Sequence, residues 1–182
     1  MRYISLLRGI NVSGQKLIKS DALRRLYESL DFGQVTTYVQ SGNVIFTSSN
    51  GNTHELEQQI TQQIEKDMGW KVPVMVLTSD KLKRIIDNNP FVKDSSNNPA
   101  FMHVTFLWFL PQHYDLVSMK NKKQPEEKIA FFDNVVYLYC PNGYGKTKLT
   151  NNFIETKLKT GATTRNWKTA NELLNIAQEL GK

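Results

Sequence analysis

The sequence predicts an α+β protein with two domains, residues 1–79 and residues 80–182. With 182 residues, 40% of them hydrophobic, the chain can form one large or two small cores, since domains commonly contain about 100–150 residues. Apolar residues follow strand-like alternation in some segments and helix-like spacing in others. A helix start at Ser79-Asp80 marks the expected boundary.

The first domain has a clear order of predicted elements. The segments are a strand over 3–7, a helix from Ser20 to a stop at Gly33, strands over 35–39 and 44–47, a helix from Thr53 to Gly69, and a strand over 72–77. Gln40-Ser41-Gly42-Asn43 forms the tight turn between the two central strands. This order, βαββαβ, predicts a ferredoxin-like domain.

The second domain is less regular and predicts the order αβαββαα. Its segments are a helix ending before Pro90, a long strand over 101–110, a weak helix to about Met119, a hairpin of 129–132 and 135–140, and helices over 147–158 and 166–180. The long strand is apolar on both faces, which indicates burial on both sides. The order fits a second, smaller ferredoxin-like unit whose last strand is replaced by a helix.

Several classes of protein are disfavoured by composition. The single cysteine, Cys140, allows no internal disulfide and favours a reducing compartment. No signal peptide opens the chain, and the longest apolar run is shorter than the roughly 20 residues that span a bilayer. We expect a cytoplasmic protein that does not associate with membranes.

The net charge of +6 is unevenly distributed. Residues 1–80 hold eight basic and eight acidic residues, whereas residues 81–182 hold fifteen and nine. Between Pro141 and Ala170 the basic residues Lys146, Lys148, Lys157, Lys159, Arg165 and Lys168 face only Glu155. Such a region attracts anions, including nucleic acid, although a solvated helix face has the same composition.

A first candidate site is the glycine-rich segment from Arg8 to Gly14. In a ferredoxin-like domain this segment lies beside the turn at Ser41-Gly42-Asn43, because strand one ends where the hairpin turns. The hydrogen-bond donors that would meet there are Arg8, Asn11, Ser13, Ser20, Ser41 and Asn43. The alternative is structural: the glycines serve turns, Asn43 adopts a left-handed conformation, and Arg8 pairs with a carboxylate such as Asp31.

A second candidate is Gly145-Lys146-Thr147, which ends like a nucleotide-binding P-loop. The glycine that this motif needs five positions earlier is replaced by Cys140, and the preceding strand belongs to a hairpin. Nucleotide hydrolysis is therefore disfavoured. A simpler anion site remains, formed by the amides of residues 145–147 at the start of a helix together with Lys146 and Lys148.

The third candidate is Thr163-Thr164-Arg165-Asn166-Trp167, immediately before the last predicted helix. Its guanidinium, amide and indole could bind an anion or stack on a base. The alternative is a helix cap by Thr164 or Asn166, with Trp167 packed beneath it and Arg165 bonded to a carbonyl or carboxylate.

Catalytic patterns are weak. His54, His103 and His113 are isolated and lack the spacing of metal ligands, and no base accompanies Cys140. We assign no catalytic residue and expect neither a metal nor a cofactor.

Four separated blocks resemble a bacterial family of uncharacterised proteins, the domain of unknown function 1697. The blocks are Leu6-Leu7-Arg8-Gly9-Ile10-Asn11-Val12, Thr37-Tyr38-Val39-Gln40-Ser41-Gly42-Asn43-Val44, Gly145 through Leu149-Thr150-Asn151, and Thr163-Thr164-Arg165-Asn166-Trp167. The resemblance implies a two-part α+β protein with a ferredoxin-like first half, and no established activity. The family usually has glycine where Ser13 stands and does not keep Lys146 and Thr147, which further disfavours a P-loop.

These observations together predict a non-enzymatic module that binds nucleic acid or a phosphorylated small molecule. Arg8, Lys146, Lys148 and Arg165 would neutralise charge. The orienting groups would be Asn11, Ser41, Asn43 and Asn166, with Trp167 or Tyr144 available for stacking. One alternative is a small-molecule enzyme with Arg8 or Arg165 as an electrophilic clamp, for which no general base is evident. Another is a module for protein contacts.

Overall fold

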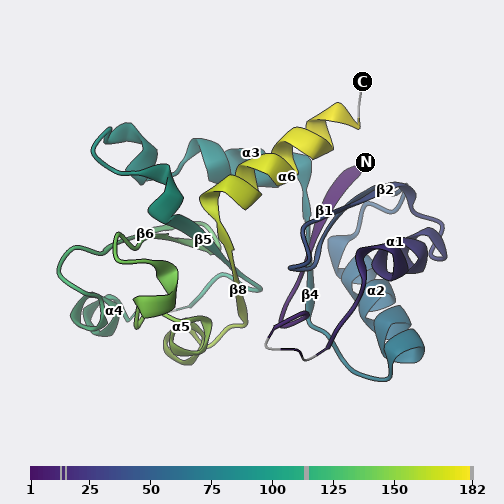
Figure 1. Cartoon of the computed structure of the whole chain (residues 1–182), viewed down its shortest axis with the longest axis horizontal. Helices are drawn as coiled ribbons and strands as arrows, with labels where there is room; N and C mark the ends of the chain where they lie inside the picture. Colours follow the sequence, from purple (N-terminus) through teal and green to yellow (C-terminus); the bar gives the residue numbers. More distant parts are fainter. Residues whose placement is uncertain (13, 15, 113–114, 181–182) are drawn as a thin grey trace. The chain divides into compact units, whose positions relative to one another are not determined.

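The computed structural model describes residues 1–12, 14, 16–112 and 115–180 (Figure 1). The chain divides into two compact units, one formed by residues 1–83 with the residues from Glu172 onward, the other by residues 84–171. The division falls inside helix α3 (Ser79–Asp87) and again inside helix α6 (Trp167–Glu179). The predicted domains, residues 1–79 and 80–182, stay a prediction.

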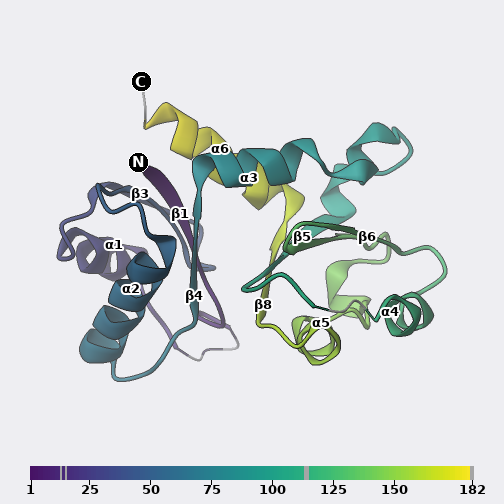
Figure 2. The same cartoon turned by 180° about the vertical axis from the view of Figure 1, so that it is seen from behind.

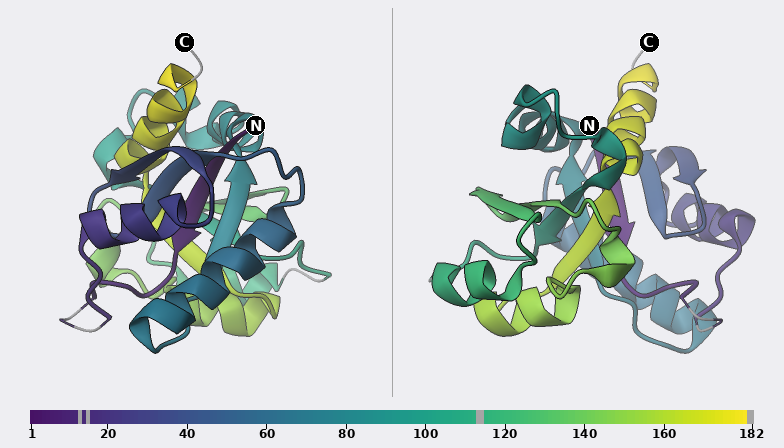
Figure 3. Two further views of the ribbon diagram at one scale, coloured as in Figure 1. Left: turned by 90° about the vertical axis from the view of Figure 1, so that its right-hand side faces the viewer. Right: turned by 60° about the vertical axis from the view of Figure 1, so that its left-hand side comes forward.

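The first unit contains the six elements that the sequence predicts, in the predicted order. These are β1 (Arg2–Leu7), α1 (Ser20–Glu28), β2 (Gly33–Tyr38), β3 (Asn43–Thr47), α2 (Thr53–Met68) and β4 (Val74–Thr78). The strands form one antiparallel sheet in the order β2-β3-β1-β4. Helices α1 and α2 lie on one face of this sheet (Figures 2 and 3, left).

Alternation along the strands builds the core of the first unit. Tyr3 and Leu7 of β1 are fully buried with Val44 and Phe46 of β3 against the apolar sides of the two helices. Helix α2 contributes Leu56, Ile60 and Ile64 at spacings of four, which lie on one helix face. Burying each such side chain contributes about 1.5–3 kcal/mol, so the core fixes the register of the sheet.

The second unit also contains a four-stranded antiparallel sheet, in the order β6-β7-β5-β8. Its elements are β5 (Met102–Leu107), α4 (Leu116–Lys122), β6 (Lys128–Phe132), β7 (Val135–Tyr139), α5 (Asn151–Leu158) and β8 (Ala162–Asn166), with 3-10 turns at Pro90–Lys93, Pro99–Phe101 and Tyr144–Lys146. Helices α4 and α5 lie side by side (Figure 3, right). Counting strands in sequence order, this sheet repeats the strand order of the first.

The predicted order αβαββαα lacks one strand and is wrong at that point, because residues 162–166 form β8. The polar composition of this segment favours a loop. The backbone instead pairs with the central strand β5, in a register that places Thr164 opposite Thr105. Their hydroxyl groups are hydrogen bonded at 2.7 Å. Threonine is β-branched and suits a strand, so paired hydroxyls allow a polar sequence to occupy a half-buried edge.

The predicted helix start at Thr147 is also wrong. Residues Tyr144–Lys146 form a single 3-10 turn, and α5 begins at Asn151. The Thr147 hydroxyl accepts the Leu149 N–H at 3.1 Å, and the Thr150 hydroxyl accepts the Phe153 N–H at 3.2 Å. The first bond holds residues 147–149 in a local turn, and the second caps α5.

The α+β class is confirmed: the described residues contain two four-stranded antiparallel sheets and six α-helices. No helix among these residues has the length and apolar character needed to cross a bilayer.

Candidate functional site

The glycine-rich segment and the hairpin turn of the first unit lie together, as predicted. The Leu7 N–H donates to the Gly42 carbonyl at 2.8 Å. Gly42 has a φ of +74°, and a Cβ atom added there would lie 2.8 Å from Cβ of Leu7 and from Cδ1 of Ile10. Both its left-handed backbone and its close packing therefore require glycine at this corner.

Asn11 fastens the glycine-rich segment rather than presenting its amide to solvent. Its Nδ2 donates to the carbonyl oxygens of Gln40 at 2.6 Å and Ile18 at 3.1 Å. Its Oδ1 accepts the Ile18 N–H at 2.9 Å, and its φ of +54° is left-handed. Three bonds from one amide tie the segment to its own end and to the hairpin turn.

Asn43 is buried and has a similar internal role. Its Nδ2 donates to the Tyr38 carbonyl at 3.0 Å and to the Ser41 hydroxyl at 2.8 Å. The left-handed conformation expected at Asn43 occurs at Gly42 and at Val39 instead. The amide thus closes the hairpin turn, and Ser41 is one of its partners.

The remaining predicted donors of this corner are less enclosed. Arg8 is half-buried, and its backbone N–H donates to the Pro73 carbonyl at 2.9 Å. Ser20 is half-buried as the first residue of α1. Ser13 lies outside the described residues. Since the amides of Asn11 and Asn43 are engaged, the corner is a braced turn.

In the second unit, Arg165 is buried in β8. Its Nη1 donates to the Thr163 hydroxyl and to the Thr164 carbonyl, both at 2.9 Å. Burial lowers the pKa of this guanidinium to about 10, because desolvation disfavours the charged form. Alternation along the strand places Arg165 on the opposite face from Thr164.

Asn166 caps helix α6, as the structural alternative expects. Its Oδ1 accepts the Thr169 N–H at 2.7 Å. Trp167 is half-buried in the first turn of that helix, and its carbonyl accepts a hydrogen bond from Nδ2 of Asn171 at 2.7 Å. Oδ1 of Asn166 and the carbonyl of Trp167 therefore have structural partners.

Tyr144 belongs to a polar network inside the second unit. Its ring stacks on His103 with 4.6 Å between ring centroids, and its hydroxyl donates to Thr164 at 3.1 Å. Thr164 in turn donates to Oδ1 of Asn151 at 2.7 Å. Burial lowers the pKa of His103 and keeps the imidazole neutral. Sequence reasoning missed this network, although His103 and Thr105 alternate with apolar residues along β5.

Cys140 is buried, and burial raises the pKa of its thiol to about 11. It is therefore a poor nucleophile. Among the described residues, no group of three or more His, Cys, Asp and Glu side chains could hold a metal ion.

The two units differ in net charge. The second unit has twelve Lys and Arg against seven Asp and Glu, whereas the first has eleven against ten. Several acidic groups of the second unit have internal partners: Asp94 pairs with Lys128, Asp115 with Lys157 and Asp133 with Arg84, while Glu127 accepts the Gln124 N–H and Glu155 the Ala162 N–H. Its exposed lysines are therefore left without compensation.

Seven lysines of the second unit are exposed: Lys93, Lys120, Lys122, Lys146, Lys148, Lys159 and Lys168. The last four, which lie between Pro141 and Ala170, are together called the lysine set. Within the part of the chain that the structure describes, none of the four forms an ion pair. Lys148 precedes helix α5 and Lys159 follows it, and the eight residues of this helix, at about 1.5 Å each, are roughly 12 Å long. No α-helix starts at residues 145–147, because α5 begins at Asn151. The predicted anion site at a helix start is therefore not formed by the amides of these residues.

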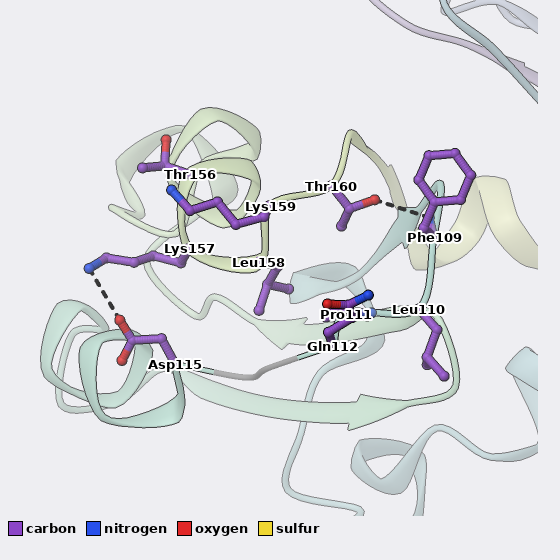
Figure 4. Close-up of a pocket in the computed structure, with 10 residues that line it drawn as sticks. All are labelled: Phe109, Leu110, Pro111, Gln112, Asp115, Thr156, Lys157, Leu158, Lys159 and Thr160. Atoms are coloured by element: carbon purple, nitrogen blue, oxygen red, sulfur yellow. Dashed lines mark hydrogen bonds and ion pairs between the residues drawn. The ribbon is translucent and has the colours of Figure 1, made fainter.

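The second unit also has a pocket of about 730 Å³, which sequence reasoning missed. Its lining residues are 109–112, Asp115 and 156–160 (Figure 4). The predicted strand over 101–110 ends at Leu107, and the two apolar residues Phe109 and Leu110 are 69% and 64% exposed. Burial on both faces is confirmed only for residues 102–107. The early end of β5 has no signal in the sequence, because Trp108, Phe109 and Leu110 continue the apolar run up to Pro111.

Comparison with known proteins supports the family resemblance. The model of the family described as "Protein of unknown function (DUF1697)" matches residues 1–137. A solved structure, that of the conserved bacterial protein SP0830 from Streptococcus pneumoniae, superimposes with a TM-score of 0.70 at 21% sequence identity. The alignment covers 97% of this chain and 98% of that one, and at this identity it shows the fold alone. No curated protein matches the chain.

Proposed function

The chain belongs to the DUF1697 family of unknown function, so we propose its function from its geometry: non-enzymatic binding of nucleic acid through the exposed lysines of the second unit. The observation that carries the proposal is the contrast between acidic side chains that have internal partners and the lysine set, whose ammonium groups face solvent. A polyanion would supply the missing counter-charges.

The predicted binding residues have different parts in this proposal. Lys146 and Lys148 remain phosphate contacts, and Lys159 and Lys168 join them. The bonds of Asn11, Asn43 and Asn166 support loops and a helix end, which favours a structural contribution from these residues. Burial of Arg165 favours an electrostatic contribution without direct contact.

The fold supports two finer proposals. We propose ferredoxin-like connectivity for the first unit, because the order β2-β3-β1-β4 with both helices on one face is the order that this fold requires. We also propose a cytoplasmic location, which the unpaired, buried Cys140 supports.

A salt series tests the proposed function. Fluorescence anisotropy of a labelled mixed-sequence oligonucleotide, single-stranded and duplex, would be measured from low to physiological salt. Each lysine that neutralises a phosphate contributes about −0.7 to the slope of log K against log salt for a single strand and about −0.9 for a duplex. Changing Lys146, Lys148 and Lys168 together to Gln should therefore reduce the magnitude of the slope by about 2.1 for the single strand and by about 2.7 for the duplex.

The matched control changes three exposed lysines of the first unit, Lys19, Lys66 and Lys81, to Gln. These also form no ion pair in the described part of the chain. This variant carries the same change in net charge and should keep the wild-type slope. Absence of binding by the wild type at low salt, or equal losses in both variants, would overturn the proposal.

A further inference from the structure

The pocket of the second unit has the size and lining of a site for a small planar group. Its volume of about 730 Å³ lies within the roughly 300–1,000 Å³ usual for ligand pockets. The lining combines apolar side chains, among them Phe109 and Leu158, with the polar groups of Gln112 and Asp115 (Figure 4). A ligand with a flat apolar face and a polar edge would match both kinds of lining.

The backbone beneath Phe109 is firmly held although its side chain is exposed. Its N–H donates to the Thr160 hydroxyl at 3.0 Å, and the preceding Trp108 N–H donates to the Gly161 carbonyl at 3.0 Å. The Trp108 bond continues the backbone pairing of β5 with β8 by one residue, and the Thr160 hydroxyl holds the next residue. An exposed aromatic ring on a fixed backbone is the platform on which single-stranded nucleic acids stack their bases.

The charges around the pocket suit a nucleotide. Lys159 is exposed at the end of α5, where its φ of +54° turns the chain. The Asp115 carboxylate accepts the Ser118 N–H at 3.0 Å and pairs with Nζ of Lys157 at 3.2 Å. Lys157 thus compensates the negative charge of Asp115. Of the charged residues in the described lining, Lys159 is the one without an ion pair.

We propose that this pocket holds one nucleobase of a single-stranded nucleic acid, stacked on Phe109, with the adjoining phosphate near Lys159. The inference rests on the proposed function and assigns it a strand type and a contact. Base stacking distinguishes it from the phosphate contacts of Lys146, Lys148 and Lys168, because stacking is insensitive to salt whereas phosphate contacts are not.

The test compares Phe109→Ala, Phe109→Leu and Phe109→Trp with the wild type, using a single-stranded oligonucleotide that carries 2-aminopurine. Loss of the ring should weaken binding roughly 5- to 150-fold, the range of one base–aromatic stack, while the salt slope stays unchanged. Phe109→Leu should weaken binding as Phe109→Ala does, and Phe109→Trp should keep it. The 2-aminopurine emission should be quenched by the wild type and by Phe109→Trp only.

Two controls separate the possible failures. Val92→Ala truncates another exposed apolar side chain of the same unit and should change nothing, and thermal melting should show that all variants are folded. If the wild type binds no oligonucleotide, both proposals fail. If it binds with a steep salt slope but the Phe109 variants, or an oligonucleotide without bases, bind equally well, only the nucleobase pocket is overturned. Retention by Phe109→Leu alone would indicate an apolar protein segment as the occupant and would also overturn it.

Discussion

The two units share one strand order, β2-β3-β1-β4 in the first and β6-β7-β5-β8 in the second, and corresponding hydrogen bonds end their first strands. The Leu7 N–H donates to the Gly42 carbonyl and the Leu107 N–H to the Asn134 carbonyl, both at 2.8 Å. One residue later, Arg8 donates to Pro73 at 2.9 Å and Trp108 to Gly161 at 3.0 Å. The first strand of each sheet therefore ends with the same two backbone hydrogen bonds.

The loop after the first strand differs between the units. In the first, Ile10 is buried and Asn11 closes the loop onto the hairpin turn. In the second, Phe109 and Leu110 are exposed and border a pocket. The same position of the same topology is therefore sealed in one unit and open in the other, which shows that loop sequence rather than sheet architecture creates the cavity.

The helices show the same contrast. Helix α2 has sixteen residues with a row of fully buried apolar side chains, whereas α4 and α5 have seven and eight residues. Short helices cover less of a sheet and leave space at their ends. The pocket lies at the end of α5, where residues 156–160 form one of its walls.

The largest expected effect is at the sealed corner. Gly42→Ala should destabilise the protein by about 2–4 kcal/mol, because the new Cβ meets Leu7 and Ile10 and the backbone is left-handed. Gly69→Ala is the control, since Gly69 has a φ of +79° with no atom within 4 Å of the added Cβ. It should cost only about 1–2 kcal/mol. Equal losses in urea unfolding would contradict the steric explanation.

A second comparison concerns the asparagines that brace each corner. Asn11→Ala removes three hydrogen bonds and should cost about 2–3 kcal/mol. Asn134→Ala removes one bond, from Nδ2 to the Leu107 carbonyl at 2.7 Å, and should cost about 1 kcal/mol. Native-state hydrogen exchange at the Leu7 and Leu107 amides would locate each loss in its own unit. A larger loss of stability for Asn134→Ala than for Asn11→Ala would contradict the view that the loop after β1 is held more tightly than the loop after β5.

Helix caps provide a third comparison. Asn52 caps α2 by accepting the N–H groups of His54 and Glu55, and Thr150 caps α5 by accepting that of Phe153. Asn52→Ala and Thr150→Ala should each cost about 1 kcal/mol in chemical denaturation. Thr150→Ser retains the hydroxyl and should restore most of the stability. A Thr150→Ala variant as stable as wild type would show that α5 is positioned by packing alone.

The smallest effect is a pH dependence confined to the second unit. Burial lowers the pKa of His103 below its usual 6.5, so the unfolded chain binds a proton that the folded imidazole does not. Stability should be complete above pH 6.5 and decrease as pH falls through the folded pKa. His103→Gln should remove this component from a series of urea midpoints. A wild-type midpoint that rises on acidification would contradict the buried, neutral assignment.

Most of the fold was predictable because it depends on local signals. Asn52-Thr53 and Gly69 mark the two ends of α2, and the turn at Gly42 defines the β2–β3 hairpin. Strand β8 was not predicted, because its threonines and arginine satisfy their polar groups within the sheet. These hydrogen bonds depend on pairing with β5, which is distant in the sequence. Non-local pairing of that kind leaves no periodic apolar pattern in a short segment.

The candidate site was less predictable than the fold. The sequence identified the meeting of residues 8–14 with residues 41–43, but it could not show that Asn11 and Asn43 are occupied by carbonyl groups. The exposed lysines agree with the charge pattern, whereas the pocket depends on where β5 ends. That end has no clear signal in the sequence, because Trp108, Phe109 and Leu110 continue the apolar run of the strand.

The first unit is completed by residues from the far end of the chain. Nη1 of Arg2 donates to the Ala177 and Gln178 carbonyls at 3.2 and 3.3 Å, and all three residues belong to that unit. During synthesis the contacts of β1 are therefore complete only after α6 has been made, whereas residues 84–171 are an uninterrupted segment. Removing residues 172–180 should consequently weaken the unit that contains β1.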